Sequence, residues 1–175
     1  MQTDPRYPIG KFDHNITVTK EMRSDFIKTI ESLPSQLRIE VENLSQQQLD
    51  TPYRDGGWTI RQVVHHLPDS HINCYVRFKL ALTEDNPQIK TYEEHLWAEL
   101  QDSFKTPIDV SLSLLESLHK RWAILLRSLT DKQFEKTFQH PEWEKITLSK
   151  TLALYAWHSK HHLAHITELK KKMGW

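Results

Sequence analysis

Four histidines lie within eight positions near the end of the chain, in the segment WHSKHHLAHI at residues 157–166. Apolar residues alternate with them, so the segment belongs to a folded helix and is unlike an appended tag. A helix advances about 100° per residue, so His158 and His162, one turn apart, project side by side. Two imidazoles with this spacing can bind one metal ion, as in other H-x-x-x-H helices.

A metal site that performs chemistry needs more than two ligands. Such sites typically take three protein ligands and leave a further position for water or substrate. We expect the third from another helix, and the adjacent His65 and His66 are the obvious source. The apolar side of their helix lies beside His66, so His66 should border the core while His65 faces away. His71 and His119 also fall on apolar faces and are reserve candidates.

The spacing also allows an interpretation without metal. A single core histidine is usually a residue whose hydrogen bonds are satisfied within the protein. Several neutral imidazoles packed together lose water without gaining partners, unless an ion or a hydrogen-bond network uses their lone pairs. The pattern alone leaves the metal site and the metal-free cluster open.

Three other residues are candidates for an auxiliary catalytic role. His161 and His165 could move protons, and Asp69, one turn beyond His66, could orient an imidazole. For each of them we favour the simpler interpretation of a solvated or rim residue. Cys74 falls on an apolar helix face, where a thiol is an inert small hydrophobe rather than a nucleophile.

Long amphipathic segments must position these side chains. Apolar residues recur at three- and four-residue steps in four segments: residues 20–44, 59–82, 110–129 and 147–173. Pro34 should kink or divide the first helix, and Pro68 should bend the second just after His66. Thr59, followed by Gln62, is a capping box that opens the second helix. Four such helices predict an all-α four-helix bundle.

The rest of the chain reads as connections. Residues 1–19 should form an irregular arm, and residues 83–108 should form a long connection with a short helix at 92–100. A connection of that length is either functional or a crossover along the bundle. No repeat or low-complexity linker marks a boundary, so we expect one domain over residues 1–175.

Composition excludes several classes of function. Lys plus Arg and Asp plus Glu each total 23, so no positive field favours nucleic acid as a partner. No apolar stretch reaches the roughly 18 residues needed to span a bilayer, and the N-terminus has no apolar signal core. The single cysteine fits a reducing compartment. We therefore expect a cytoplasmic protein without membrane or nucleic-acid partners.

The chain resembles a known family in several motifs: YPIG, LDTPYRDGGWTIRQVVHHL, SH and HHLAHI. Together they are similar to the DinB superfamily and, within it, to the YfiT group of metal-dependent hydrolases, which is related to bacillithiol S-transferases. The resemblance implies a metal bound by one histidine of the second helix and an i, i+4 pair of the last, here His66, His158 and His162. It further implies a cytoplasmic homodimer with one zinc or nickel ion per chain. The usual H-R-G-Q ending reads HLAH here, so the resemblance assigns no role to His165.

The expected function is metal-dependent hydrolysis of a small molecule by water activated at a three-histidine site. The first alternative is an S-transferase, in which the metal deprotonates a low-molecular-weight thiol such as bacillithiol and delivers it to an electrophile. The second is a metal-binding or pH-responsive protein without catalysis, in which every coordination position would be filled by protein or stability would change near the imidazole pKa.

Overall fold

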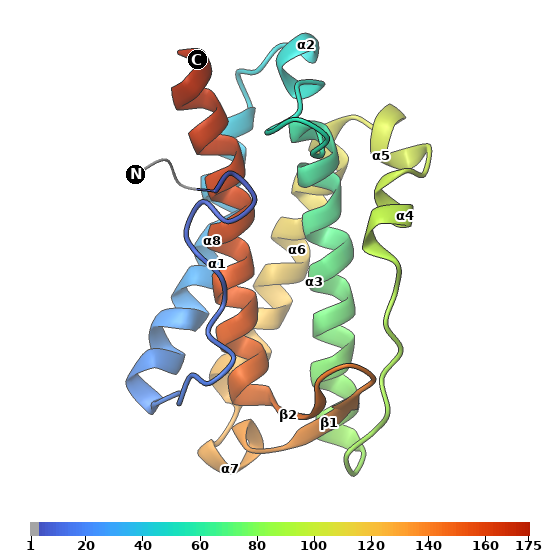
Figure 1. The fold of residues 1–175 in the computed structure, drawn as a ribbon. Coiled ribbons are helices and arrows are strands. Elements are labelled where there is room, and N and C mark those ends of the chain that lie inside the picture. Colours follow the sequence, from blue (N-terminus) through green and yellow to red (C-terminus); the bar gives the residue numbers. More distant parts are fainter. Residues whose placement is uncertain (1–3) are drawn as a thin grey trace.

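Four long helices make up most of the protein. The computed structural model describes residues 4–175, and its long helices are α1 (Lys20–Val41), α3 (Ile60–Thr83), α6 (Ile108–Ser128) and α8 (Leu148–Met173). Figure 1 shows them side by side in one bundle. The predicted four-helix bundle is therefore confirmed. Both α1 and α3 continue through their prolines, so Pro34 does not divide the first helix.

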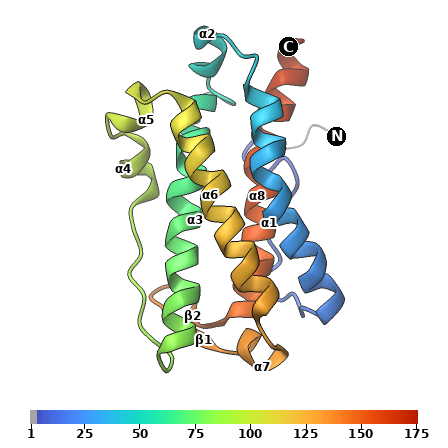
Figure 2. The same cartoon turned by 180° about the vertical axis from the view of Figure 1, so that it is seen from behind.

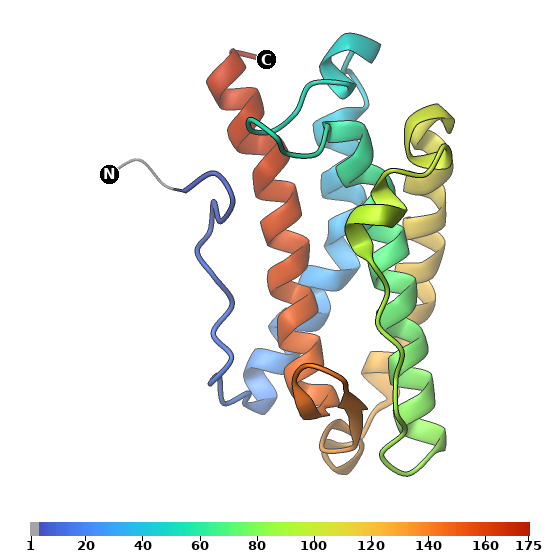
Figure 3. The same ribbon diagram turned by 45° about the vertical axis from the view of Figure 1, so that its right-hand side comes forward.

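The order of the helices around the bundle differs from their order along the chain. Helix α1 packs against α6 and α8, and α3 packs against the same two helices. The consecutive long helices α1 and α3 thus occupy opposite corners, as Figures 1 and 2 show. Residues 84–107 run back along α3, so α6 follows in the same direction as α3 (Figure 3). This long connection is a crossover, which was one of its two expected roles.

Short elements lie at the ends of the bundle and along the side of α3: α2 (Gln46–Leu49), α4 (Glu94–Ala98), α5 (Asp102–Lys105), α7 (Asp131–Phe134), β1 (Thr137–His140) and β2 (Glu144–Thr147). The antiparallel hairpin β1–β2 was not predicted, because its four-residue strands are too short for a clear alternating pattern. The expected short helix at 92–100 is α4. The arm has no helix or strand over residues 4–19, and residues 1–3 of the predicted arm lie outside the described residues.

Local capping signals fix the ends of the two helices that carry the histidines. The Thr59 side chain accepts a hydrogen bond from the Gln62 backbone N–H. The Gln62 side chain accepts one from the Thr59 backbone N–H, which completes a capping box. At the start of α8 the Thr147 side chain accepts a hydrogen bond from the Lys150 backbone N–H, without a returning bond. Helix α8 ends at Gly174, whose φ of 71° is a left-handed conformation that glycine adopts without strain. None of the helices in residues 4–175 is long and apolar enough to cross a membrane.

The core consists of two apolar clusters with a polar layer between them. One cluster gathers around Phe78, Trp122 and Leu152, and the other around Leu37, Val63 and further aliphatic residues of all four helices. Four histidines lie between the two clusters along the sequences of α3, α6 and α8: His71, His119, His158 and His162. His66 precedes Leu67, the last α3 residue of the second cluster. The bundle thus places its imidazoles at mid-height, where apolar layers cover them from both ends.

Candidate metal centre

Three imidazoles from two helices meet in the polar layer. His66 of α3 and the pair His158 and His162 of α8 each offer one nitrogen, and these atoms all lie within 4.8 Å of one another. His66 and His162 are buried, while His158 is half-buried. The structure therefore brings together the three residues that the sequence analysis proposed as metal ligands.

The donor set fits a divalent metal ion. His66 Nε2 and His158 Nε2 are 3.3 Å apart. Two nitrogens bound to one tetrahedral zinc ion at 2.0–2.1 Å would be separated by about 3.3 Å, so the pair is already at a suitable spacing. His162 Nδ1 is buried and has no hydrogen-bond partner among residues 4–175. Three imidazoles form a set that suits zinc, nickel or copper.

A chain of hydrogen bonds runs from His158 away from this centre. His158 Nδ1 lies 3.1 Å from His71 Nε2. His71 Nδ1 lies 2.8 Å from His119 Nε2, and His119 Nδ1 lies 2.6 Å from the backbone carbonyl oxygen of Ile30. The chain joins α8, α3, α6 and α1, so all four long helices contribute to it. His71 and His119 are 0% and 1% exposed.

The carbonyl at the end of the chain determines which nitrogen of each neutral ring carries the proton. A carbonyl oxygen can only accept, so His119 donates from Nδ1 and accepts at Nε2. His71 must then donate from Nδ1 and accept at Nε2, and His158 must donate from Nδ1. The remaining nitrogen of His158 is Nε2, which is left with its lone pair directed at His66. Outer hydrogen bonds of this kind orient metal-binding histidines in other proteins.

Burial keeps these imidazoles neutral. Burial is the main cause that lowers the pKa of His66 to about 3 and that of His119 to about 4. It also lowers the pKa values of His71, His158 and His162 well below 6.5, and the neighbouring imidazoles add to this effect. Neutral rings retain the lone pairs that a metal needs, so the site is ready for a cation at neutral pH.

Trp58 covers one side of the centre. Its ring centroid lies 4.6 Å from that of His66 and 6.2 Å from that of His162, to which it is nearly parallel at 15°. The indole directly precedes the Thr59 cap, so the start of α3 also fixes this cover. An apolar ring beside a metal site excludes water and limits access from that side.

Three histidines occupy positions that the sequence analysis described wrongly, because His65, His161 and His165 are all buried. His65 was expected to face away from the core, but it is 5% exposed and its Nδ1 lies 2.7 Å from Ser111 Oγ on α6. Helix α3 is covered by α6 and by the α4–α5 region, so both sides of its first half are buried. His161 is also buried rather than solvated, because the N-terminal arm covers α8 and the His161 ring stacks on Trp157 at 4.4 Å.

The other two auxiliary candidates lie outside the group of three. His165 is buried, stacks on Tyr53 at 4.0 Å and has its Nε2 3.4 Å from the carbonyl oxygen of Arg6. Asp69 forms no side-chain hydrogen bond with an imidazole of the described residues. Burial, followed by the charge of Asp102, raises the pKa of Asp69 to about 6. The structure therefore does not place Asp69 where it would orient an imidazole.

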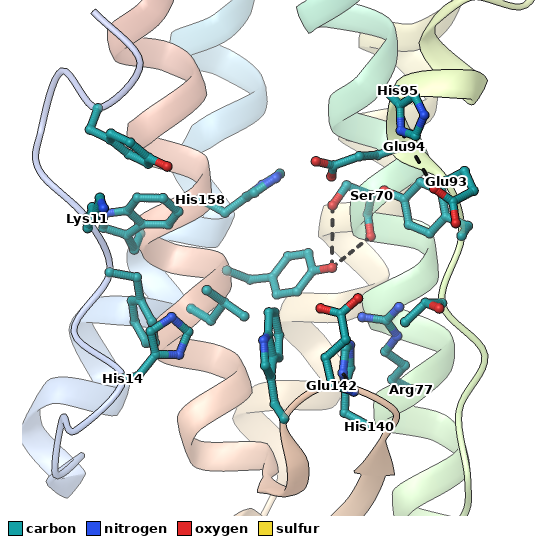
Figure 4. Close-up of a pocket in the computed structure, with 18 residues that line it drawn as sticks. Lys11, His14, Ser70, Arg77, Glu93, Glu94, His95, His140, Glu142 and His158 are labelled. Carbon is teal, nitrogen blue, oxygen red and sulfur yellow. Dashed lines mark hydrogen bonds and ion pairs between the residues drawn. The ribbon is translucent and has the colours of Figure 1, made fainter. Parts of the chain in front are cut away.

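A cavity of about 670 Å³ opens beside His158. Figure 4 shows its walls, which come from the N-terminal arm, α3, the crossover connection, the β1–β2 turn and α8. Tyr155 reaches across its centre, where its hydroxyl donates to the Ser70 carbonyl oxygen at 3.3 Å. Glu94 extends from α4 with its carboxylate towards His158 (Figure 4), and partial burial raises the pKa of this carboxyl group. The cavity gives a small molecule direct access to one of the three histidines.

Several residues of the site were not found from the sequence. His71 and His119 were considered only as reserve ligands, and their apolar-face positions were the one signal of their role. Glu94 and Arg77 face the cavity, but Glu94 lies on a five-residue helix inside the crossover connection. Helical periodicity says nothing about how such a connection folds back over the bundle. His140 of β1, which also lines the cavity, belongs to the hairpin that was not predicted.

Comparisons with known proteins find chains that are similar along almost their whole length. A protein of Bacillus cereus (strain 03BB102) with the name "Putative metal-dependent hydrolase" is 58% identical over 172 residues, which is 98% of this chain and 99% of the relative. A solved structure described as "YfiT from Bacillus subtilis is a probable metal-dependent hydrolase with an unusual four-helix bundle topology" is 53% identical, with a TM-score of 0.95 over 99% of both chains.

A more distant structure shares the fold. TT2238, described as a four-helix bundle protein, is 18% identical and superimposes with a TM-score of 0.60 over 83% of this chain and 98% of its own. The family model for the DinB superfamily matches residues 29–166, which include all three clustered histidines. Because that model spans most of the chain and the nearer relatives align along almost all of it, the chain belongs to the DinB superfamily.

Proposed function

We propose that the protein is a metal-dependent hydrolase in which His66, His158 and His162 hold one divalent ion per chain. The observation that carries the proposal is the meeting of three neutral, largely buried imidazoles at the wall of a cavity large enough for a small-molecule substrate. The descriptions of the two near relatives, "Putative metal-dependent hydrolase" and "a probable metal-dependent hydrolase", support it. Zinc and nickel both suit an all-imidazole site.

The cavity supplies the other groups that hydrolysis needs. A divalent ion at this site would lower the pKa of a bound water molecule to about 7. Glu94 directs its carboxylate towards His158 and is the group placed to accept a proton from the attacking water (Figure 4). The raised pKa of this carboxyl group makes it a better proton acceptor than an ordinary surface glutamate. Trp58 shields the opposite side of the imidazoles from water.

Thiol transfer is the second candidate function. A thiol that reaches the ion through the same cavity would lose its proton and become a nucleophile. The thiol of Cys74 is not available for this role, because Cys74 is fully buried in the core cluster around Phe78 and Trp122. The cavity beside His158 favours either reaction over a closed, non-catalytic metal site, in which protein ligands would occupy all four positions.

We also propose that the protein acts on small molecules in the cytoplasm as a homodimer. These proposals rest on the family resemblance and on the even balance of charges. Light scattering coupled to size-exclusion chromatography would give the mass of the particle. A mass of twice 20.8 kDa would support the dimer, and a single-chain mass would exclude it.

The test of the metal site is metal content by mass spectrometry. The wild type, without a histidine tag, would be compared with His66→Ala, His158→Ala and His162→Ala, with His161→Ala and His165→Ala as matched controls from α8. We expect about one ion per chain in the wild type and in both controls, and loss of the ion in the other three. Full retention in these three variants, or no metal in the wild type after reconstitution, would exclude the site. Screening ester, amide and thiol substrates with the loaded protein would then separate hydrolysis from thiol transfer.

A further inference from the structure

Arg77 is a buried cation on the wall of the cavity. It lies on α3, lines the cavity and is only 9% exposed. Among residues 4–175, no ion pair or hydrogen bond involves its side chain, whereas the similarly buried Arg61 binds both Asp50 and Gln46. Figure 4 shows Arg77 near the hairpin end of the cavity, beside His140 and away from His158.

A guanidinium group in this position is best stabilised by a bound anion. Arginine stays charged at all physiological pH values, so it cannot escape the cost of burial by losing its proton. None of the Arg77 nitrogens is among the fully covered side-chain atoms of residues 4–175 that have no hydrogen-bond partner, so the guanidinium group reaches the cavity. Arginine satisfies itself best there with two parallel hydrogen bonds to a carboxylate. The empty hydrogen-bonding capacity of Arg77 therefore faces the space in which a ligand would lie.

The acidic side chains around the cavity do not fill this capacity. Glu93 pairs with His95 at 3.7 Å, and Glu94 is directed towards His158. Glu142 stands exposed on the turn between β1 and β2 and forms no ion pair with Arg77. Each of the three carboxylates is thus occupied elsewhere or open to water.

The position of Arg77 sets the length and character of the ligand. Arg77 follows His66 by eleven residues on one helix, which separates their Cα atoms by roughly 16 Å along the axis. Helical side chains lean back towards the N-terminus, so the guanidinium lies closer to the histidines than its Cα does. The walls of the cavity also carry the rings of Tyr92, Trp143 and Tyr155. The separation and these rings fit an elongated molecule with an apolar or aromatic body.

We propose that Arg77 binds a carboxylate group of the substrate, while the reactive end of the same molecule lies at the three histidines. The carboxylate accepts hydrogen bonds from the guanidinium and supplies the missing counter-charge. Lys11 on the arm does not provide an equivalent anchor, because it is exposed and lies over the Tyr7 ring at 5.1 Å. The carboxylate site stands by itself, and only the placement of the reactive end rests on the proposed function.

The first experiment measures the anion site without metal chemistry. Full-length protein with ¹⁵N-labelled arginine, treated with a chelator so that no ion can bind the ligand, is titrated with hexanoate and with 1-hexanol. The Arg77 Nε–H resonance is assigned from its loss in Arg77→Gln. We expect hexanoate, but not hexanol, to shift this resonance, and Arg77→Gln to weaken hexanoate binding by about tenfold or more.

Two control variants keep the result interpretable. Arg61→Gln removes an equally buried arginine outside the cavity and should leave hexanoate binding unchanged. Glu142→Gln tests whether the hairpin carboxylate is the real counter-charge. A shift of the Arg77 resonance by Glu142→Gln in the ligand-free protein, together with equal responses to hexanoate and hexanol, would overturn the proposal.

The second experiment separates this proposal from the metal site. Protein reconstituted with Co²⁺ is titrated with 6-mercaptohexanoate and with 6-mercaptohexanol, and the cobalt–thiolate absorption is followed. We expect the acid to bind about tenfold more tightly in the wild type and the two thiols to bind alike in Arg77→Gln. If neither thiol binds cobalt while hexanoate still shifts Arg77, the metal assignment has failed and the carboxylate site stands. Equal affinity of both thiols in the wild type would exclude the role of Arg77.

Discussion

His71 Nδ1 and His119 Nε2 lie 2.8 Å apart and join two helices through fully buried imidazoles. Neither residue belongs to the group of three that meets at the candidate metal centre. Because the Ile30 carbonyl oxygen can only accept a hydrogen bond, their contact nevertheless fixes the direction of the hydrogen bond from His158. The bundle thus determines the protonated nitrogen of a proposed ligand on α8 from a backbone atom of the neighbouring helix α1.

Removal of His71 should weaken metal binding without removing a ligand. His71→Phe keeps an aromatic ring in the layer but leaves His158 Nδ1 without its acceptor. Outer-shell losses of this kind reduce metal affinity by roughly 10–100-fold. Competition with a chromogenic zinc chelator would measure the affinity. His65→Phe is the matched control, since it removes a buried, hydrogen-bonded imidazole on the same helix, and wild-type affinity in His71→Phe would contradict the prediction.

The metal-free protein should lose stability in mild acid. Burial lowers the pKa of His119 to about 4, while the unfolded chain binds a proton near 6.5. Between these values the unfolded state binds more protons, so the free energy of unfolding falls as the pH falls through this window. His66, His161 and His165 act in the same direction, because burial also lowers their pKa values.

Urea unfolding at pH 7.5, 6 and 5 would measure this effect. Each fully shifted imidazole contributes a slope of up to about 1.4 kcal/mol per pH unit. His119→Gln should reduce the pH dependence of the unfolding free energy by the contribution of one imidazole. An unfolding free energy that stays constant from pH 7.5 to 5 would rule out several neutral, buried imidazoles.

Removal of the N-terminal arm should expose two histidines. The Trp157 indole N–H donates to the Gly10 carbonyl oxygen at 3.2 Å, and the arm covers His161 and His165, which are 7% and 3% exposed. After deletion of residues 1–14, diethyl pyrocarbonate should modify both rings much faster than in the full chain. Peptide mass spectrometry would locate the modification. His95, which is exposed on α4, should react equally in both proteins, and equal protection of His161 and His165 would refute the role of the arm.

Cys74 should be unreactive in the native protein. Its side chain is 0% exposed, and burial raises the pKa of its thiol well above the usual value. A buried, protonated thiol reacts slowly with aromatic disulfides. We expect labelling by Ellman's reagent only after denaturation, while Cys74→Ala keeps its metal content. Rapid labelling of the native protein would reopen the possibility of a nucleophilic thiol.

The sequence alone determined the long helices and the helix faces that carry the histidines. Apolar periodicity and caps act over a few residues, so Thr59 and Thr147 mark their helix starts without any tertiary information. The i, i+4 spacing of His158 and His162 also follows from helix geometry alone. With the family resemblance, these local features were sufficient to predict the bundle and to select His66 as the third member of the cluster.

Only the tertiary structure decided what lies around that cluster. The contact of His71 with His119 depends on the packing of α3 against α6. The contact of His71 with His158 depends on the packing of α3 against α8. The burial of His65 and His161 depends on neighbours that are distant in sequence, namely α6 and the arm. The cavity is formed where the crossover connection and the hairpin fold over the bundle, and neither segment has a repeating apolar pattern. Local sequence patterns specify helices, whereas these contacts arise from the packing of segments that meet only in the folded chain.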